Sequence, residues 1–148
     1  MSSFGIGVQN LKNSGNLGTL FRSAYNMGAS FTFCIGRRYK TQKSDTCKSF
    51  RQIPFFEYET FEEFYRNIPK GHKLVGVEYP LAKAVPLSGF THPDNCVYLL
   101  GAEDNGLSTE AIGKCHLATY IPSKYCLNVA VAGSVILYDR MTKRGETY

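Results

Sequence analysis

Three separated segments of the sequence combine glycine or asparagine turns with polar side chains that can take part in chemistry. They cover residues 13–22, 100–108 and 121–130. Each turn leads into a strand edge or a helix start, where backbone N–H and C=O groups are available to hold a ligand. These segments are therefore the candidate binding and catalytic parts of the chain.

The first segment has the composition of a phosphate-binding turn. Gly15-Asn16-Leu17-Gly18 stands at an expected helix start, where the first N–H groups lack partners within the helix and carry partial positive charge. The segment lacks the Gly-x-Gly-x-x-Gly spacing of a dinucleotide-binding fold and the Gly-Lys-Ser/Thr ending of a P-loop. Alone, it supports a binding role only weakly, because a structural glycine turn with an asparagine cap would have the same residues.

Apolar runs of strand length alternate with helical patterns along the chain. Such alternation predicts an α/β fold with a mainly parallel sheet flanked by helices. The expected strands are residues 5–8, 31–35, 73–77, 96–100 and 118–121.

The expected helices carry recognisable end signals. Asn16 is placed to cap the first helix, and Gly28 stands where a left-handed residue ends it. Thr60 and Glu63 form a capping box for the second helix. The last helix is expected over about residues 128–140, and residues 143–148 are expected to be a frayed tail.

Length and composition predict one globular domain over residues 1–148, with 43% hydrophobic residues. No apolar stretch approaches the roughly 18 residues of a membrane span, and the N-terminus does not have the pattern of a secretory signal. We therefore expect a cytoplasmic protein without membrane contact. The five cysteines include no Cys-x-x-Cys pair, so we expect neither a disulfide framework nor a metal site.

The net charge of +5 is concentrated in the first third of the chain. Residues 1–51 carry +7, and the remainder carries −2. This distribution indicates a surface for a polyanion such as nucleic acid, although an exposed loop over residues 36–51 would look the same. The basic residues that would contact such a nucleic acid are Arg37, Arg38, Lys40, Lys43, Lys48 and Arg51.

In this order, the three segments resemble the three motifs of the SpoU (TrmH-like) branch of the SPOUT RNA methyltransferases. The first motif pairs an asparagine with an arginine six positions later, as Asn16 and Arg22 do. The second is a strand ending in Gly-x-Glu before a glycine turn, which Gly101 and Glu103 match. The third is an Ile-Pro turn followed by a Ser-Leu-Asn that opens the last helix, and Ile121-Pro122 and Leu127-Asn128-Val129 match it.

The resemblance implies a trefoil knot in the C-terminal part, a homodimer and S-adenosylmethionine as cofactor. It further implies methylation of a ribose 2'-hydroxyl of tRNA or rRNA. The resemblance also implies that Arg22 engages the hydroxyl. Asn16 and Asn128 would orient the Arg22 side chain, and Glu103 would fix the same network by hydrogen bonds. The residues expected to contact the cofactor are Val77, Gly101, Ile121, Cys126 and Leu127.

Two departures from the family pattern lie in the third motif. Cys126 stands where the family usually has serine, and the loop before Leu127 is a few residues shorter. Both changes affect the expected cofactor pocket. The Cys126 thiol is a weaker hydrogen-bond donor than the hydroxyl of serine. Three hypotheses therefore stay open: an active 2'-O-methyltransferase, a knotted RNA-binding protein with lost or altered catalysis, and a small-molecule nucleotide-binding domain.

Overall fold

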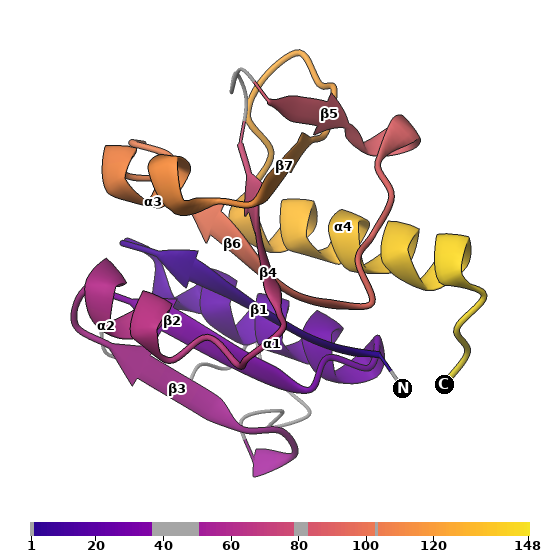
Figure 1. Cartoon of the computed structure of the whole chain (residues 1–148), viewed down its shortest axis with the longest axis horizontal. Helices are drawn as coiled ribbons and strands as arrows, with labels where there is room; N and C mark the ends of the chain where they lie inside the picture. The colour runs from indigo at the N-terminus through magenta and orange to yellow at the C-terminus, as the bar shows by residue number, and fades with distance from the viewer. Residues whose placement is uncertain (1, 37–50, 79–82, 103) are drawn as a thin grey trace.

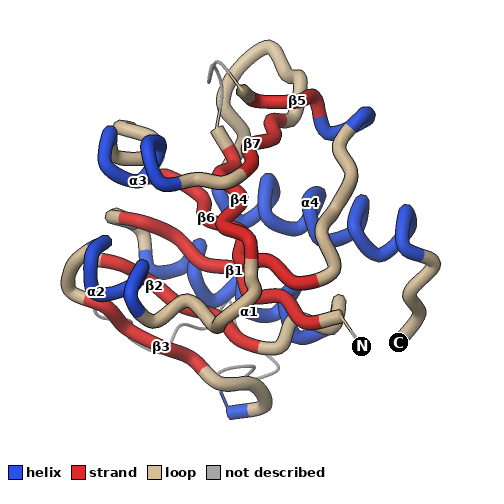
Figure 2. The backbone as a smooth tube through the Cα atoms, in the orientation of Figure 1, coloured by secondary structure: helices blue, strands red, loops and turns tan. Residues whose placement is uncertain are grey.

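A seven-stranded sheet forms the centre of the computed structural model of this protein, in the order β3-β2-β1-β6-β4-β7-β5 (Figures 1 and 2). The structure describes residues 2–36, 51–78, 83–102 and 104–148. Within these ranges all strand pairings are parallel, which confirms the predicted α/β class. The trefoil knot stays a prediction. The strands are β1 (Ser3–Gln9), β2 (Phe31–Ile35), β3 (Phe55–Tyr58), β4 (Lys73–Val77), β5 (Ala84–Pro86), β6 (Asn95–Gly101) and β7 (Leu117–Tyr120).

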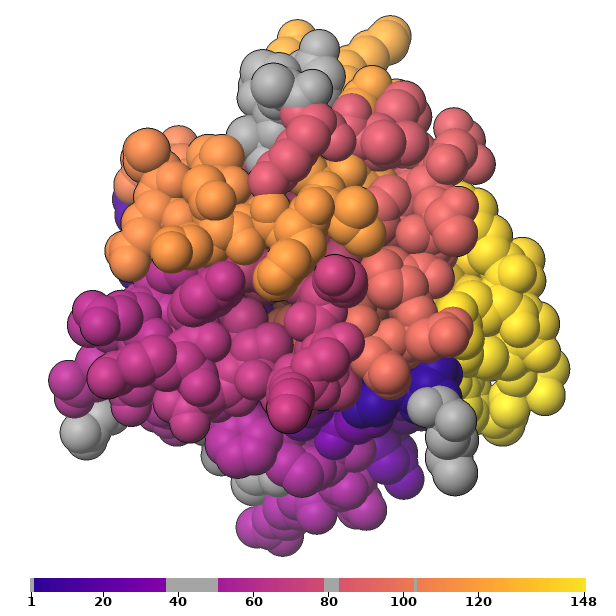
Figure 3. Space-filling model, viewed as in Figure 1, coloured from indigo at the N-terminus to yellow at the C-terminus, as the bar shows by residue number. Residues whose placement is uncertain are grey.

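Helices cover both faces of the sheet. Helices α1 and α4 share one hydrophobic core with β1 and β6, and α2 and α3 pack into a second core on the other face (Figure 1). In the space-filling view of Figure 3, α4 forms the right-hand edge of the molecule. The helices are α1 (Ser14–Asn26), α2 (Phe61–Arg66), α3 (Thr109–Lys114) and α4 (Val129–Arg144), with a short 3-10 turn η2 (Leu87–Gly89).

All five expected strands are present, and two edge strands and α3 were not predicted. Strand β3 has partly exposed side chains, and β5 has three residues and ends in a proline. Edge strands lack the continuous apolar runs of buried parallel strands, which explains why the sequence pattern missed them.

The predicted helix caps are partly confirmed. Asn13, not Asn16, caps α1, and its side chain accepts a backbone N–H of the first turn at 2.9 Å. The helix begins earlier than predicted, so Asn16 lies inside its first turn. Gly28 has a φ of +80°, as expected for a left-handed residue after a helix. Thr60 caps α2 by accepting the N–H of Glu63 at 3.1 Å.

The C-terminal tail is more ordered than predicted. Helix α4 continues to Arg144 and ends at Gly145, which has a φ of +64°. Glu146 then accepts hydrogen bonds from Arg144 at 2.9 Å and from the Ser2 hydroxyl at 3.0 Å. These contacts hold the two ends of the chain side by side (Figure 1), so the prediction of fraying is wrong for the start of this tail.

Candidate functional site

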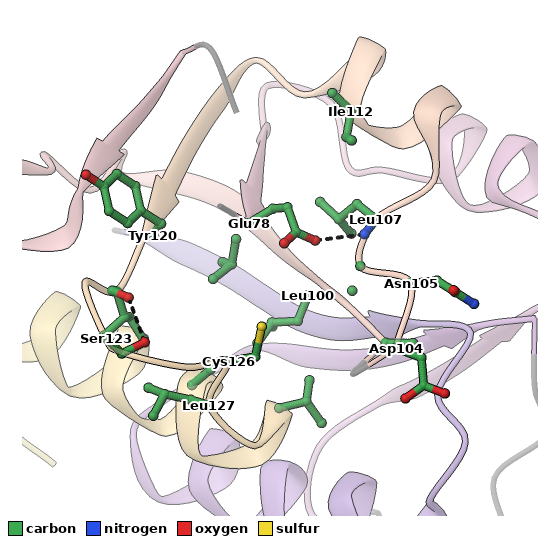
Figure 4. A pocket seen from close by; sticks show the side chains of 17 residues that line it. Glu78, Leu100, Asp104, Asn105, Leu107, Ile112, Tyr120, Ser123, Cys126 and Leu127 are labelled. Carbon is green, nitrogen blue, oxygen red and sulfur yellow. Dashed lines mark hydrogen bonds between the residues drawn. The ribbon is translucent and has the colours of Figure 1, made fainter. Parts of the chain in front are cut away.

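A pocket of about 430 Å³ opens at the carboxyl ends of β4, β6 and β7, beside the start of α4. Because parallel strands place these ends at one edge of the sheet, loops far apart in sequence meet there. We call this cavity the strand-end pocket (Figure 4). Its lining comprises Val77, Glu78, Leu100, Gly101, Ala102, Asp104, Asn105, Gly106, Leu107, Ile112, Tyr120, Ile121, Ser123, Cys126, Leu127, Val129 and Ala132.

All five residues proposed to contact a cofactor line the strand-end pocket. Val77 and Gly101 end strands β4 and β6. Ile121 is half-buried directly after β7, while Cys126 and Leu127 are exposed in the loop that leads to α4. The structure thus brings together parts of the second and third motifs with a neighbouring strand end.

The wall of the pocket formed by residues 101, 102 and 104–107 depends on two glycines. A Cβ atom at Gly101 would lie 2.3 Å from the carbonyl carbon of Gly106, so the two backbone segments can approach only without that atom. The Gly106 N–H donates to the carbonyl of Ala102 at 2.9 Å, and Gly106 has a φ of +61°. The wall of the pocket at this point is therefore backbone rather than side chain.

Two polar side chains that the sequence analysis missed hold this wall in place. The Leu107 N–H donates to the Glu78 carboxylate at 2.9 Å. Buried Gln9, at the end of β1, exchanges two hydrogen bonds of 3.0 Å with Ser108, which also caps α3. In the sequence, each is recognisable only as a polar residue at the end of an apolar strand. The glycine turn that each one contacts lies far away in the sequence and becomes a neighbour only in the fold.

A hydrogen bond between two asparagines links the first motif to the third. The Asn128 side-chain amide donates to the Asn16 side-chain oxygen at 2.9 Å. The Asn128 oxygen meanwhile accepts from the N–H groups of Ala130 and Val131 at 2.9 and 3.3 Å, which caps α4. Because that oxygen must face the helix, the amide nitrogen must face Asn16. The link thus brings together two of the residues that are expected to orient Arg22.

Arg22 is not part of this asparagine link. It is exposed on α1, about 9 Å along the helix axis from Asn16 by the rise of an α-helix. Among the described residues, the structure shows no hydrogen bond from its guanidinium to Asn16 or Asn128. Arg51 is exposed. Glu103, Arg37, Arg38, Lys40, Lys43 and Lys48 lie outside the described residues.

Neither a metal cluster nor a membrane span is found in the described parts of the chain. No three His, Cys, Asp or Glu side chains gather there in a way that could hold a metal ion. None of the helices described combines the length and apolar character that crossing a membrane requires.

Comparison with known proteins gives consistent matches. The model of the SpoU rRNA Methylase family matches residues 3–138. The 23S rRNA (guanosine-2'-O-)-methyltransferase RlmB of Acinetobacter baylyi is 27% identical over 139 residues, covering 87% of this chain and 55% of that protein.

Solved structures show the same fold. The AdoMet-bound rRNA methyltransferase from Sinorhizobium meliloti superposes with a TM-score of 0.84 at 24% identity, covering 97% of this chain and 57% of that one. The SpoU methyltransferase AviRb from Streptomyces viridochromogenes, in complex with AdoMet, has a TM-score of 0.85 at 24% identity and covers 100% of this chain and 60% of its own. The chain thus spans a little over half the length of these relatives.

Proposed function

Because this chain belongs to the SpoU rRNA Methylase family, we propose that it transfers the methyl group of S-adenosylmethionine to a ribose 2'-hydroxyl of tRNA or rRNA. One observation carries the proposal: the strand-end pocket gathers residues of the second and third motifs, and the asparagine link ties it to the first. The names of the relatives described above, as rRNA methyltransferases, support the same activity. We take residues 1–148 as one catalytic domain.

The strand-end pocket suits a nucleoside-bearing cofactor. Its volume lies within the usual range of small-molecule sites, roughly 300–1,000 Å³, and its walls combine apolar side chains with backbone. The missing Cβ at Gly101 leaves room for the close backbone turn that forms one wall. When bound, S-adenosylmethionine supplies an electrophilic methyl group on a sulfonium. We assign Val77, Gly101, Ile121, Cys126 and Leu127 to its binding.

For catalysis, we assign Arg22 to engage the ribose hydroxyl and the adjacent RNA phosphate. Its exposure on α1 makes the guanidinium accessible to RNA. A guanidinium stays protonated at neutral pH, so Arg22 acts through position and charge rather than as a base. Asn16 and Asn128 hold the start of α1 against the start of α4, and Glu103 is assigned to the same polar network.

The RNA is proposed to lie along the basic N-terminal third of the chain. The excess charge of residues 1–51 attracts the phosphate backbone without reading sequence. Neutralising Arg37, Arg38 and Lys40 should flatten the salt dependence of RNA binding, as measured by filter binding at several salt concentrations. An unchanged slope would show that these cations face solvent.

We also propose a homodimer formed through the exposed face of α4. Val131, Val135 and Tyr138 are 49%, 36% and 59% exposed and lie on one helical stripe. Burying such an exposed apolar stripe against a second copy of the chain would remove it from water. Light scattering of the purified chain should give twice its mass of 16.5 kDa at micromolar concentration. A mass of one chain would contradict the dimer.

The decisive test of function is calorimetric titration with S-adenosylmethionine, followed by transfer of labelled methyl groups to purified tRNA and rRNA. We expect micromolar binding and label at a 2'-hydroxyl. Arg22→Ala should abolish transfer and leave cofactor affinity nearly unchanged, whereas Arg66→Ala, at an exposed position of α2, should change neither. A folded protein that binds RNA but no cofactor would support the non-catalytic alternative instead.

A further inference from the structure

Glu78 differs from the other carboxylate among the described lining residues of the strand-end pocket. Asp104 is 53% exposed and forms an ion pair with Lys12. Glu78 instead follows directly after β4 and is half-buried, and its backbone N–H donates to the Thr119 carbonyl at 3.1 Å. The sheet therefore fixes the backbone from which the Glu78 carboxylate enters the pocket.

The Glu78 carboxylate is also fixed at its far end. One oxygen, Oε2, accepts the Leu107 N–H at 2.9 Å. A Cβ atom at Gly106 would lie 2.2 Å from Oε2 and 3.3 Å from Oε1, so the carboxylate occupies the space that a side chain there would fill. Figure 4 shows Glu78 pointing from the end of its strand into the pocket. The Glu78 carboxylate is thus held at both ends of its side chain.

The chemistry around Glu78 favours a ligand with hydroxyl donors. An ionised carboxylate only accepts hydrogen bonds, and two neighbouring hydroxyls can donate to one such group. Val77, Leu100 and Ile121 line the same pocket with hydrocarbon side chains, which accept no hydrogen bond. The other polar lining side chains, Asp104, Asn105, Tyr120 and Ser123, come from the turn after β6 and from the end of β7 and the loop that follows it. In dinucleotide-binding folds, an acidic side chain serves the ribose hydroxyl in the same way.

We propose that the Glu78 carboxylate accepts hydrogen bonds from the ribose hydroxyls of the cofactor's adenosine and so selects a ribonucleoside in the strand-end pocket. This role rests on the proposed function. This role differs from a purely structural one, because a carboxylate that only held the Leu107 N–H would not make affinity depend on the hydroxyls of the ligand's ribose. Hydrogen bonds to a charged acceptor are strong enough to change affinity by about ten- to a hundredfold.

The test is calorimetric titration of the full chain with S-adenosylhomocysteine and with its 2'-deoxy and 3'-deoxy analogues. The wild-type protein should bind the parent ligand at least about tenfold more tightly than one of the deoxy analogues. Glu78→Gln should bind the parent ligand more weakly and treat all three nearly alike. The amide oxygen of the variant can still accept the Leu107 N–H, so the wall is retained.

Glu110→Gln is the matched control, because it makes the same chemical change at an exposed position in the first turn of α3. It should discriminate among the three ligands as the wild type does. If Glu78→Gln does not fold, as judged by circular dichroism, Glu78→Asp takes its place. The shorter acid keeps the charge but withdraws it from the sugar, and it should lose most of the discrimination.

Three results would overturn the proposal. Unchanged discrimination in the Glu78 variants would leave Glu78 as a brace only, with the proposed function intact. If Glu78→Gln weakens the binding of S-adenosylmethionine but not of S-adenosylhomocysteine, with discrimination among sugars unchanged, the carboxylate lies against the sulfonium instead. A folded wild-type protein that binds neither cofactor form would remove the proposed function itself, and the role of Glu78 with it.

Discussion

Helix α4 begins at the strand-end pocket and ends over the start of β6, and its two ends differ in how their polar groups are paired. At its start, Asn128 is exposed and bonds to two backbone N–H groups and Asn16. At its other end lies a group of packed polar side chains that we call the Arg140 cluster. Its members are His92, Tyr98, Asp139 and Arg140.

Three members of the Arg140 cluster, His92, Tyr98 and Arg140, are buried, and the Asp139 side chain is 23% exposed. Arg140 is 0% exposed, and its guanidinium donates to the carbonyls of Pro93 and Asp94 at 2.7 and 2.9 Å and to the Tyr98 hydroxyl at 3.2 Å. It also stacks on the Phe4 ring, 4.3 Å from the ring centre. His92 bridges Tyr98 and the Asp139 carboxylate at 2.6 and 2.8 Å.

One helix thus has packed polar groups at one end and, at the other, exposed polar groups that a ligand can reach. Buried polar groups that satisfy one another specify a single packing, and losing one member leaves the others unpaired. Turns with exposed polar groups contribute less to the free energy of unfolding, but they can reach a ligand. Variants at the two ends should therefore have different signatures.

The largest expected effect on stability is at the Arg140 cluster. Arg140→Met keeps much of the side-chain volume but leaves buried carbonyls and the Tyr98 hydroxyl without their donor. We expect the free energy of unfolding to fall by about 3–5 kcal/mol, measured by urea denaturation. Arg66→Met, at an exposed position of α2, should cost less than about 0.5 kcal/mol. Similar losses in both variants would contradict the special role of the cluster.

At the strand-end pocket, Gly101→Ala should affect cofactor affinity more than stability. The added Cβ would lie within 2.6 Å of three backbone atoms of Gly106 and Leu107, so the wall must shift. We expect a loss of about 1–3 kcal/mol in stability and a much larger relative loss of cofactor affinity, on the order of a hundredfold. Gly113→Ala, with no atom within 4 Å of its added Cβ, is the control. Retained affinity in Gly101→Ala would show that the wall does not contact the ligand.

Two substitutions at Asn128 separate its helix cap from its link to Asn16. Asn128→Ala removes both and should lower stability by about 1 kcal/mol. Asn128→Asp keeps an acceptor for the helix N–H groups but removes the donor to Asn16, so stability should stay near that of the wild type. Both variants should lose methyl transfer. Full activity in Asn128→Asp would show that the link is dispensable, and thermal denaturation checks the cap.

The smallest expected effect is a dependence of stability on pH. Burial lowers the pKa of His92, against the opposing hydrogen bond and charge of Asp139. Unfolded histidine titrates near pH 6.5, so below about that pH the unfolded chain binds a proton that the folded chain does not. Stability contributed by neutral His92 is thus complete above pH 6.5 and is lost as the pH falls.

The slope of that loss cannot exceed about 1.4 kcal/mol per pH unit for one proton. Urea denaturation between pH 7.5 and 5 measures it, in wild type and in His92→Gln. Tyr98, Asp139, Arg140 and Lys143 surround the imidazole, so the variant should be less stable at pH 7.5 but have a flatter profile. An equal slope in both proteins would assign the titration to another group.

Sequence patterns predict those parts of this chain whose information is local. The buried strands are continuous apolar runs, and the three motifs each lie within about ten residues, so both could be recognised. Gln9 and Glu78 could not, because their partners Ser108 and Leu107 become neighbours only when the sheet forms. The Arg140 cluster was missed for the same reason. The prediction that Asn16 caps α1 was wrong, because Asn13 stands three residues earlier and is the asparagine that caps the helix.

The exposure of Cys126 has a practical consequence. Of the cysteines that the structure describes, Cys34, Cys96 and Cys115 are buried, and Cys126 alone is exposed, on the loop that lines the strand-end pocket. With Cys47, which lies outside the described residues, replaced by serine, a maleimide dye would attach at this one position. Because Cys126 is also assigned to the cofactor, bound ligand should slow this labelling, and the rate of dye attachment would measure occupancy of the pocket without radioactivity or an RNA substrate.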